Sequence, residues 1–464
     1  MKNRTISEKI ADFAYKASLN DIPNDVVKKA KLMLLDFLAS AIGGYNAAGS
    51  KEIVDLATKL APGKCSIIGY KTKVSPPFAA LANGTIGHAL DYDDTHSKSV
   101  LHPSVVIAPA VFSLGEDREV SGEKLLVSFI VGVETVCKLG LACKIGPLQI
   151  GYIYTSLLGT FGASIASAKL LNLTRDEMIN SLGIAYSFTS GNAEQLIEGT
   201  LSKRLQAGIA SMNGLIASLL SSTGFTGAKE AFEGKYGFFN VYIRGNYDTT
   251  PIDELGCKYE IPYVSFKPYP CCRLTHTSID AVLILKKKYN LKANLIEEII
   301  VGVNKQAYNA NAEPIDIKKH PRNIVDAQFS IPYTVAVALL YGKVSIEDFT
   351  ENSIKRKEVL KVAEKVTPVI DDEIEKRYGR EISPATVTIK LTNGKVLNEK
   401  VIYPLGEPQN PMDEKMLVNK FLDASRYSNA LSLKEAEDIA KMILSIEKIN
   451  NVRDIMDRLV RKTR

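Results

Sequence analysis

Apolar residues recur at helical spacing almost without interruption from Ile6 to about residue 245. In one segment they follow Asn24 or Asp25, either of which can cap the start of a helix, and the spacing ends at Gly43-Gly44. Further helices are predicted over residues 76–95, 103–115, 121–142, 155–171, 174–189 and 205–223. Such a long series of amphipathic helices predicts a mainly α domain.

The pattern changes after Gly256, where prolines between residues 261 and 270 predict an extended connection between two domains. The elements expected beyond it are a helix over about 275–288, a strand over 298–304, a helix over about 329–341, and strands over 387–391 and 397–403. Asn393-Gly394 separates the last two strands and is typical of a tight hairpin turn. The second part of the chain therefore predicts a smaller α+β domain.

The C-terminal part returns to helical spacing. Helices are predicted over about 412–424, 432–447 and 450–462, and we expect them to pack back on the first domain. At 464 residues the chain is too long for a single compact core, which agrees with two domains.

The charge balance favours a small anionic substrate over a nucleic acid. Lys and Arg number 58 against 52 Asp and Glu, and the basic residues are dispersed among acidic ones rather than gathered in a stripe. The six cysteines, at positions 65, 137, 143, 257, 271 and 272, include no C-x-x-C pair, so reduced thiols are expected instead of a zinc site or a disulfide framework.

A cytoplasmic location is expected, because the N-terminal residues lack the apolar core and cleavage site of a secretory signal. The longest apolar run, from Leu125 to Cys143, is interrupted by Glu134 and Lys138. No membrane span is predicted.

The densest group of reactive side chains lies between His88 and His102, which contains three of the five histidines. If residues 83–96 are helical, one face carries His88, Asp91, Tyr92 and Thr95, whereas Asp93 and Asp94 point elsewhere. Asp91, Thr95 and His102 are the candidates that this pattern favours for a site. The alternatives are that the acidic residues are simply solvated at a helix end and that His102 only packs in the core.

Two cationic segments are further candidates. Lys203 and Arg204 lie just ahead of a stripe of small residues, Ala207, Ala210, Ser211, Gly214 and Ala217, which predicts close helix packing. Lys267, Cys272, Arg273 and His276 lie on the connection between the domains, where substrates commonly bind. The alternatives are that Lys203 and Arg204 form a surface charge pair, and that the segment from Lys267 to His276 is an ordered proline-rich linker.

Several motifs occur together in one order. They are N-G-x-x-x-H-A-L-D-Y-D-D-T-H, H-P-S-V-V-I-A-P-A, S-K-R-L-Q-A-G, K-P-Y-P-C-C-R-L-T-H-T-S-I-D, D-A-Q-F-S-I-P-Y and Y-P-L-G-E-P-Q-N-P. In this arrangement, collinear from about residue 6 to 425, the chain resembles the MmgE/PrpD family. That family includes 2-methylcitrate dehydratase, cis-aconitate decarboxylase and iminodisuccinate epimerase.

The resemblance implies a homodimer and an active site without cofactor or metal. It also implies a large all-helical domain formed by residues 1–264 and 405–464, with an inserted α+β lid domain at 265–404. The family active-site positions fall on Asp91, Thr95, His102, Lys203 and Lys267, and a histidine of the lid motif falls on His276.

The chain departs from the family at two positions. Ile153, within Gly151-Tyr152-Ile153-Tyr154, replaces the histidine of a Gly-aromatic-His-Pro motif, and Cys272 takes the place of a histidine in decarboxylase members. A second proton carrier is therefore expected among Tyr152, Tyr154 and His276.

The resulting hypothesis is a hydro-lyase of a small di- or tricarboxylate. Such an enzyme needs a base for the α proton and cations for the carboxylates. We expect His102 to be the base and Asp91 to orient it. The residues expected to bind substrate, besides the cations Lys203, Lys267 and Arg273, are Thr95, His96, Cys272 and Tyr152.

Other functions stay open at this point. An epimerase or a decarboxylase uses similar groups, and the loss of the histidine at Ile153 is compatible with a non-catalytic member. A terpene cyclase is suggested only by the D-x-D-D string and lacks support, because the chain has no tryptophan for a carbocation pocket. His88, Asp91 and His96 imitate metal ligands, but the cysteine spacing of an iron-sulfur hydro-lyase is missing.

Overall fold

The structure, a computed structural model, describes residues 4–379 and 383–460, and its internal contacts divide the chain into two compact units. Unit 1 comprises residues 1–89, 93–264 and 413–464. Unit 2 comprises residues 265–412 together with the three residues 90–92. The chain thus leaves unit 1 twice, once for a long segment and once for three residues of the motif that begins at His88.

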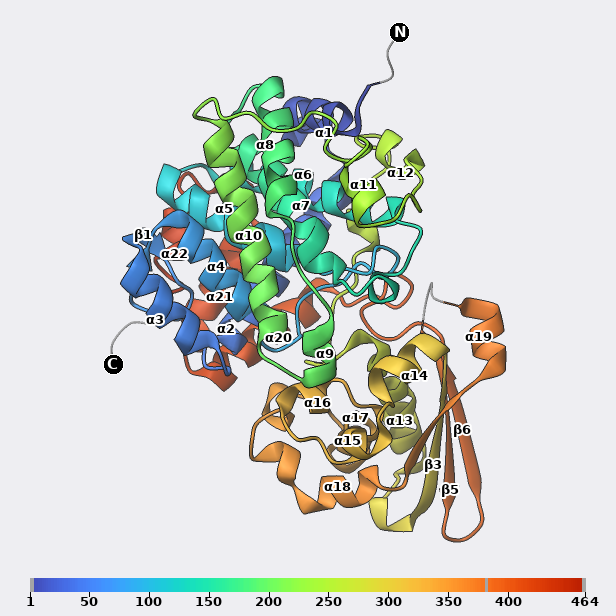
Figure 1. The fold of residues 1–464 in the computed structure, drawn as a ribbon. Coiled ribbons are helices and arrows are strands. Elements are labelled where there is room, and N and C mark those ends of the chain that lie inside the picture. Colours follow the sequence, from blue (N-terminus) through green and yellow to red (C-terminus); the bar gives the residue numbers. More distant parts are fainter. Residues whose placement is uncertain (1–3, 380–382, 461–464) are drawn as a thin grey trace. The chain divides into compact units, whose positions relative to one another are not determined.

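Unit 1 is built mainly of helices (Figure 1). Its first nine helices are α1 (Ile6–Lys16), α2 (Asn24–Gly44), α3 (Ser50–Leu60), α4 (Pro76–Gly87), α5 (Ser104–Arg118), α6 (Gly122–Ala142), α7 (Tyr154–Leu170), α8 (Arg175–Phe188) and α9 (Glu194–Glu198). They are followed by α10 (Ser202–Ser221), α11 (Phe238–Val241), α12 (Thr250–Asp253), α20 (Glu414–Ser428), α21 (Leu433–Leu444) and α22 (Arg453–Met456). A short antiparallel pair, β1 (Pro62–Ser66) and β2 (Lys73–Val74), corrects the expectation that this part is all-helical.

Helix α10 packs tightly against α4 and α7 through its small residues. A Cβ added to Gly208 would lie 2.2 Å from the carbonyl oxygen of Leu81, and one added to Gly214 would lie 2.5 Å from the Cβ of Ala163. The close packing predicted from the small-residue stripe is confirmed. The helix begins at Ser202, earlier than predicted, so Lys203 lies in its first turn and not on a connection ahead of it.

Helix α6 is long and apolar enough to cross a membrane by length and composition, but 94% of its apolar window is buried inside the protein. It packs against α5 and α7. The two charged residues that interrupt its sequence have partners within unit 1. Glu134 accepts a hydrogen bond from the backbone N–H of Ile261 (2.8 Å), and Lys138 Nζ lies 2.9 Å from Glu260. The apolar surface of α6 is therefore core surface of unit 1.

The C-terminal helices belong to unit 1. Helix α20 packs against α2, and Lys420 Nζ lies 2.7 Å from the Asp36 carboxylate in an ion pair with almost no exposure. The prediction of a third long helix at 450–462 is wrong over its described part, because residues 453–456 form only the short helix α22. Residues 461 and 462 lie outside the described part of the chain.

Unit 2 contains a four-stranded sheet in the order β4-β3-β5-β6. Its strands are β3 (Ile296–Val303), β4 (Val366–Ile370), β5 (Ala385–Leu391) and β6 (Val396–Val401), and its helices are α13 (His276–Tyr289), α14 (Lys305–Asn311), α15 (Ile315–Lys319), α16 (Ile324–Gln328), α17 (Ile331–Tyr341), α18 (Lys357–Ala363) and α19 (Asp372–Tyr378). Strands β5 and β6 form the predicted hairpin, with Gly394 at a φ of +84° in the turn (Figure 1). Strand β4, which pairs in parallel with β3, was not predicted.

Unit 2 extends to Met412, beyond the division at residue 404 that we expected. The backbone N–H of Leu405 donates to Asp280 of α13 (2.7 Å), and the carbonyl of Gly406 accepts from the N–H of Phe266 (3.0 Å). These bonds tie the segment after β6 to the start of unit 2.

Candidate active site

Helix α4 ends at Gly87, directly before the polar motif, whereas we predicted helix as far as residue 95. Asp91 adopts a φ of +52°, which belongs to the left-handed region and not to an α-helix. The prediction that His88, Asp91, Tyr92 and Thr95 share one helical face is therefore wrong. His88 and its neighbours lie instead on an irregular segment between α4 and α5.

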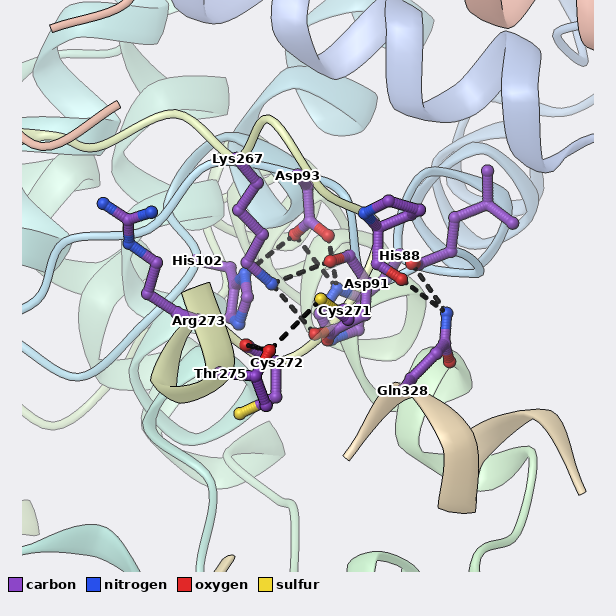
Figure 2. A network of polar contacts seen from close by, with 12 residues as sticks. His88, Asp91, Asp93, His102, Lys267, Cys271, Cys272, Arg273, Thr275 and Gln328 are labelled. Carbon is purple, nitrogen blue, oxygen red and sulfur yellow. Dashed lines mark hydrogen bonds and ion pairs between the residues drawn. The ribbon is translucent and has the colours of Figure 1, made fainter. Parts of the chain in front are cut away.

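Asp93 lies between two imidazole rings of unit 1. One carboxylate oxygen lies 2.9 Å from His88 Nδ1, and the other lies 3.1 Å from His102 Nδ1 (Figure 2). The two rings also contact each other edge to face, with centroids 4.8 Å apart. We assigned the orientation of His102 to Asp91, but the structure gives this contact to Asp93, a residue that the helical pattern had excluded.

Lys203 completes this group from the first turn of α10, with Nζ 2.9 Å from His88 Nε2. An ammonium group only donates hydrogen bonds, so Nε2 accepts and Nδ1 carries the hydrogen that faces Asp93. Burial lowers the pKa of His88 to about 4, so the ring is neutral at neutral pH. We call Lys203, His88, Asp93 and His102 the histidine cluster.

The charge on Asp93 is stabilised within the histidine cluster. Burial by itself would raise the pKa of the carboxyl group, but the two adjacent imidazoles outweigh burial and hold the pKa of Asp93 well below its usual value. The fully buried carboxylate of Asp93 lies beside the Nδ1 atom of His102 and orients that ring. The histidine cluster thus contains the base-and-orienter pair typical of proton-transfer sites.

His102 keeps one ring nitrogen for a ligand. Its side chain is 17% exposed, and its Nε2 makes no hydrogen bond to any residue that the structure describes. The backbone N–H of His102 donates to the Thr155 hydroxyl (3.1 Å), which fixes the position of the residue before α5. With Nδ1 turned toward Asp93, Nε2 is the atom available to accept a proton.

Asp94 anchors the segment that carries His102. Its carboxylate accepts hydrogen bonds from the backbone N–H (3.1 Å) and the hydroxyl of Ser104, the first residue of α5. Burial and repulsion from the nearby Asp36 raise the pKa of Asp94 well above its usual value. Asp94 serves the local structure of unit 1, because both hydrogen-bond donors belong to the start of α5.

Lys267 forms a second cationic group, within unit 2. Its Nζ lies 2.8 Å from the carbonyl oxygen of Asp91 and 2.9 Å from the Asp91 carboxylate (Figure 2). The neighbouring carbonyl of Leu90 accepts a hydrogen bond from Gln328 Nε2 (2.7 Å). Gln328 was missed by sequence reasoning, although it lies in the D-A-Q-F motif; it holds residues 90–92 in unit 2 together with Lys267.

Arg273 and His276 are occupied by contacts within unit 2. Arg273 Nη2 lies 2.8 Å from Glu407, and Arg273 Nη1 lies 3.0 Å from His276 Nδ1. The other ring nitrogen of His276 faces the Cys271 carbonyl at 3.3 Å. Burial, together with the adjacent Arg273, holds the pKa of His276 well below its usual value, so the ring is neutral. These contacts point to structural roles for both residues.

His96 and Tyr154 also have internal partners. His96 Nδ1 accepts a hydrogen bond from the Ser99 N–H (3.1 Å), and its Nε2 lies 3.3 Å from Glu260. The hydroxyl of the buried Tyr154 donates to the carbonyl of Ile145 (2.5 Å), and burial raises the pKa of Tyr154. His96 is therefore turned toward the buried charges beside α6, and the phenolic proton of Tyr154 is held by the backbone.

Thr95 differs from these residues, because its hydroxyl is buried and lacks a hydrogen-bond partner among the residues described. An unsatisfied buried hydroxyl is uncommon in proteins and marks Thr95 as a group that a ligand can satisfy.

Tyr152 packs edge to face against Tyr242, with ring centroids 5.3 Å apart.

Comparison with known proteins gives matches to both parts of the chain. Residues 8–250 match the MmgE/PrpD N-terminal domain, and residues 269–448 match the MmgE/PrpD C-terminal domain. The chain belongs to the MmgE/PrpD family. The resemblance seen in the sequence motifs is thereby confirmed.

Relatives within the MmgE/PrpD family have more than one named activity. The cis-aconitate decarboxylase of Aspergillus terreus (strain NIH 2624 / FGSC A1156) is 30% identical over 98% of this chain and 96% of the relative. The cis-aconitate decarboxylase of Homo sapiens is 24% identical over 97% of this chain and 94% of the relative. The 2-methylcitrate dehydratase of Escherichia coli O157:H7 is 24% identical, with 84% of each chain covered.

The two positions at which this chain departs from the MmgE/PrpD pattern have distinct surroundings. Ile153 is the residue before α7, with a backbone in the extended region. Cys272 is buried, and its N–H donates to the carbonyl of Gln328 (2.9 Å). Burial raises the pKa of the Cys272 thiol, so it is neutral at neutral pH. Neither side chain supplies a charge.

Proposed function

We propose that this MmgE/PrpD protein is a lyase that acts on a small di- or tricarboxylate, most simply as a hydro-lyase. The observation that carries the proposal is the histidine cluster, in which a buried, ionised Asp93 orients His102 and leaves Nε2 of that ring for a substrate. This is the arrangement that abstraction of a proton next to a carboxylate requires.

In the proposed reaction, His102 Nε2 removes the α proton, and Asp93 stabilises the imidazolium that forms. The positive charge of Lys203 stabilises the enolate-like charge on the substrate carboxylate. The neutral His88, which joins Lys203 to Asp93, positions both groups. His102 then returns its proton to the departing hydroxide, which completes the elimination of water.

Lys267 and Thr95 are proposed to bind the substrate. Asp91 fixes the Lys267 ammonium through two contacts, and a fixed ammonium is suited to a carboxylate. The Thr95 hydroxyl would donate to an oxygen of the substrate.

Decarboxylation is the second candidate reaction. It is favoured by the 30% identity to a protein named cis-aconitate decarboxylase over nearly the whole chain. In that case, His102 would protonate the carbanion left by loss of CO2, with Lys203 stabilising its charge. Epimerisation has less support, because it usually needs a second proton carrier. Tyr154 and His276 both have internal partners, which leaves Tyr152 as the candidate for that role.

The test is turnover of a panel that contains 2-methylcitrate, citrate and cis-aconitate, with products identified by mass spectrometry. An unsaturated product that has lost water supports the hydro-lyase, and loss of CO2 assigns the decarboxylase. Deuterium from solvent in an otherwise unchanged substrate would assign an epimerase. No turnover of any carboxylate, or full turnover by His102→Gln, would overturn the proposal.

A homodimer, a cytoplasmic location and catalysis without a cofactor are further parts of the proposal. Analytical ultracentrifugation of the purified protein tests the dimer. Turnover that persists after dialysis against a chelator tests the absence of a metal requirement. A sedimentation coefficient for a monomer, or activity restored only by an added metal, would contradict these parts.

A further inference from the structure

Lys318 is a buried cation without a compensating contact. It lies in α15 of unit 2 with only 7% of its surface exposed. Its ammonium group makes no hydrogen bond or ion pair to any residue between 4 and 379 or between 383 and 460. The adjacent Lys319 provides a contrast, because its Nζ lies 3.0 Å from the Glu364 carbonyl and 3.5 Å from the Glu364 carboxylate.

Asp326 balances the charge of Lys318 only in part. Lys318 is within electrostatic range of Asp326, but that carboxylate is already paired with Arg322, whose Nε lies 2.8 Å away and whose Nη2 lies 3.2 Å away. Arg322 therefore offsets part of the attraction between Asp326 and Lys318. Burial lowers the pKa of Lys318, as expected for an ammonium group without a partner.

Cys272 connects Lys318 with the candidate site of unit 2. The Cys272 N–H donates to the carbonyl of Gln328 (2.9 Å), and two residues further along the chain the Ser330 hydroxyl donates to the carbonyl of Lys318. The thiol also interacts electrostatically with Lys318 and with Lys267. Because this thiol is neutral, it does not balance the charge of Lys318. An ammonium group that is largely shielded from water and has no direct partner binds an anion that reaches it more strongly than an exposed one does.

We propose that Lys318 binds a carboxylate of the substrate, as a second cation beside Cys272 in addition to Lys267. The inference rests on the proposed function and makes it more specific. With the two ammonium groups of Lys267 and Lys318 for its carboxylates, the protein would prefer a tricarboxylate to the dicarboxylate that lacks one of these carboxylates. Lys318 would then be a specificity-determining residue.

The experiment measures binding of tricarballylate and of glutarate, which is tricarballylate without its central carboxylate, by isothermal titration calorimetry. The proteins are the full-length wild type, Lys318→Met, Lys318→Gln and the control Lys319→Met. We expect both Lys318 variants to bind tricarballylate roughly tenfold more weakly or worse, since a charged hydrogen bond is lost, and the wild-type preference over glutarate to shrink. Lys319→Met should bind both ligands as the wild type does.

Thermal unfolding without ligand separates this role from a structural one. Replacement of a buried, unpaired ammonium by methionine should leave the midpoint unchanged or raise it. Unchanged tricarballylate affinity in Lys318→Met, an equal loss for both ligands, or a lowered midpoint in both Lys318 variants would overturn the inference while leaving the proposed function intact. Failure of the wild type to bind either ligand or turn over any carboxylate would instead overturn the proposed function, and the inference with it.

Discussion

Lys203 Nζ lies 2.9 Å from His88 Nε2, although 115 residues separate the two in the chain. This contact fixes the tautomer of His88, and the tautomer in turn aims a hydrogen at Asp93. The orientation of His102 thus depends on Lys203 through His88 and Asp93. Substitution of any residue of the histidine cluster should therefore alter the position of the His102 ring and of its catalytic Nε2 atom.

Asp93→Asn should lower kcat by roughly a thousandfold or more, because the amide can neither hold the correct His102 tautomer nor stabilise an imidazolium. Asp91→Asn is the matched comparison, since the Asp91 carboxylate lies 2.9 Å from Lys267 Nζ, whereas the Asp93 carboxylate lies 3.1 Å from His102 Nδ1. We expect Asp91→Asn to act mainly on KM. Steady-state kinetics on the substrate found in the panel measure both, and a larger fall in kcat for Asp91→Asn would contradict the assignment.

Stability should decrease as the pH falls from about 6.5 toward 4. The folded-state pKa of His88 is lowered to about 4, so over this range the unfolded chain binds a proton that the folded protein does not. The contribution is of order 3 kcal/mol, from the free energy per pKa unit. Urea unfolding at pH 7 and pH 5 should show a smaller loss in His88→Gln than in the wild type. His320→Gln, at an exposed histidine, should keep the wild-type loss.

Lys420→Met should destabilise unit 1 by about 3 kcal/mol or more, because it leaves the Asp36 carboxyl buried without its ion-pair partner. The double variant Asp36→Asn/Lys420→Met should recover part of this loss. Lys390→Met removes an exposed pair with Glu297 and should change the free energy of unfolding by less than about 1 kcal/mol. Chemical denaturation measures all three, and equal effects of the two lysine variants would contradict the role of burial.

Thr95→Val should raise KM with little change in stability. The threonine hydroxyl is buried without a partner among the described residues, so an isosteric methyl group should leave the free energy of unfolding unchanged or raise it by up to about 1 kcal/mol. Thr95→Ser keeps a hydroxyl and should keep most of the affinity. A wild-type KM in Thr95→Val would exclude a contact between Thr95 and the substrate.

Local patterns in the sequence predicted the elements that depend on neighbouring residues. Helix α2 ends at Gly44, and the hairpin of β5 and β6 turns at Asn393-Gly394, as their spacing and turn residues indicated. The small-residue stripe of α10 indicated its tight packing against α4 and α7. Each of these features follows from helical or strand periodicity, which a short window of sequence contains.

Contacts between distant segments determined where α4 ends and which carboxylate contacts the His102 ring. Helical spacing placed Asp91 on the useful face and excluded Asp93, but the backbone leaves the helix at Gly87 and Asp93 lies beside both imidazoles. Gln328 holds Leu90 from 238 residues away, and no local pattern contains that bond.

The sequence by itself determined the helical class, the hairpin, the family and most of the reactive side chains, because periodicity and motifs are properties of the chain. Only the tertiary structure decided which of those side chains have internal partners. Arg273 is paired with Glu407, whereas Lys318 is buried without a partner among the described residues. A cation in a sequence carries the same formal charge in either case, and burial and pairing, which arise on folding, determine whether that charge is left for a ligand.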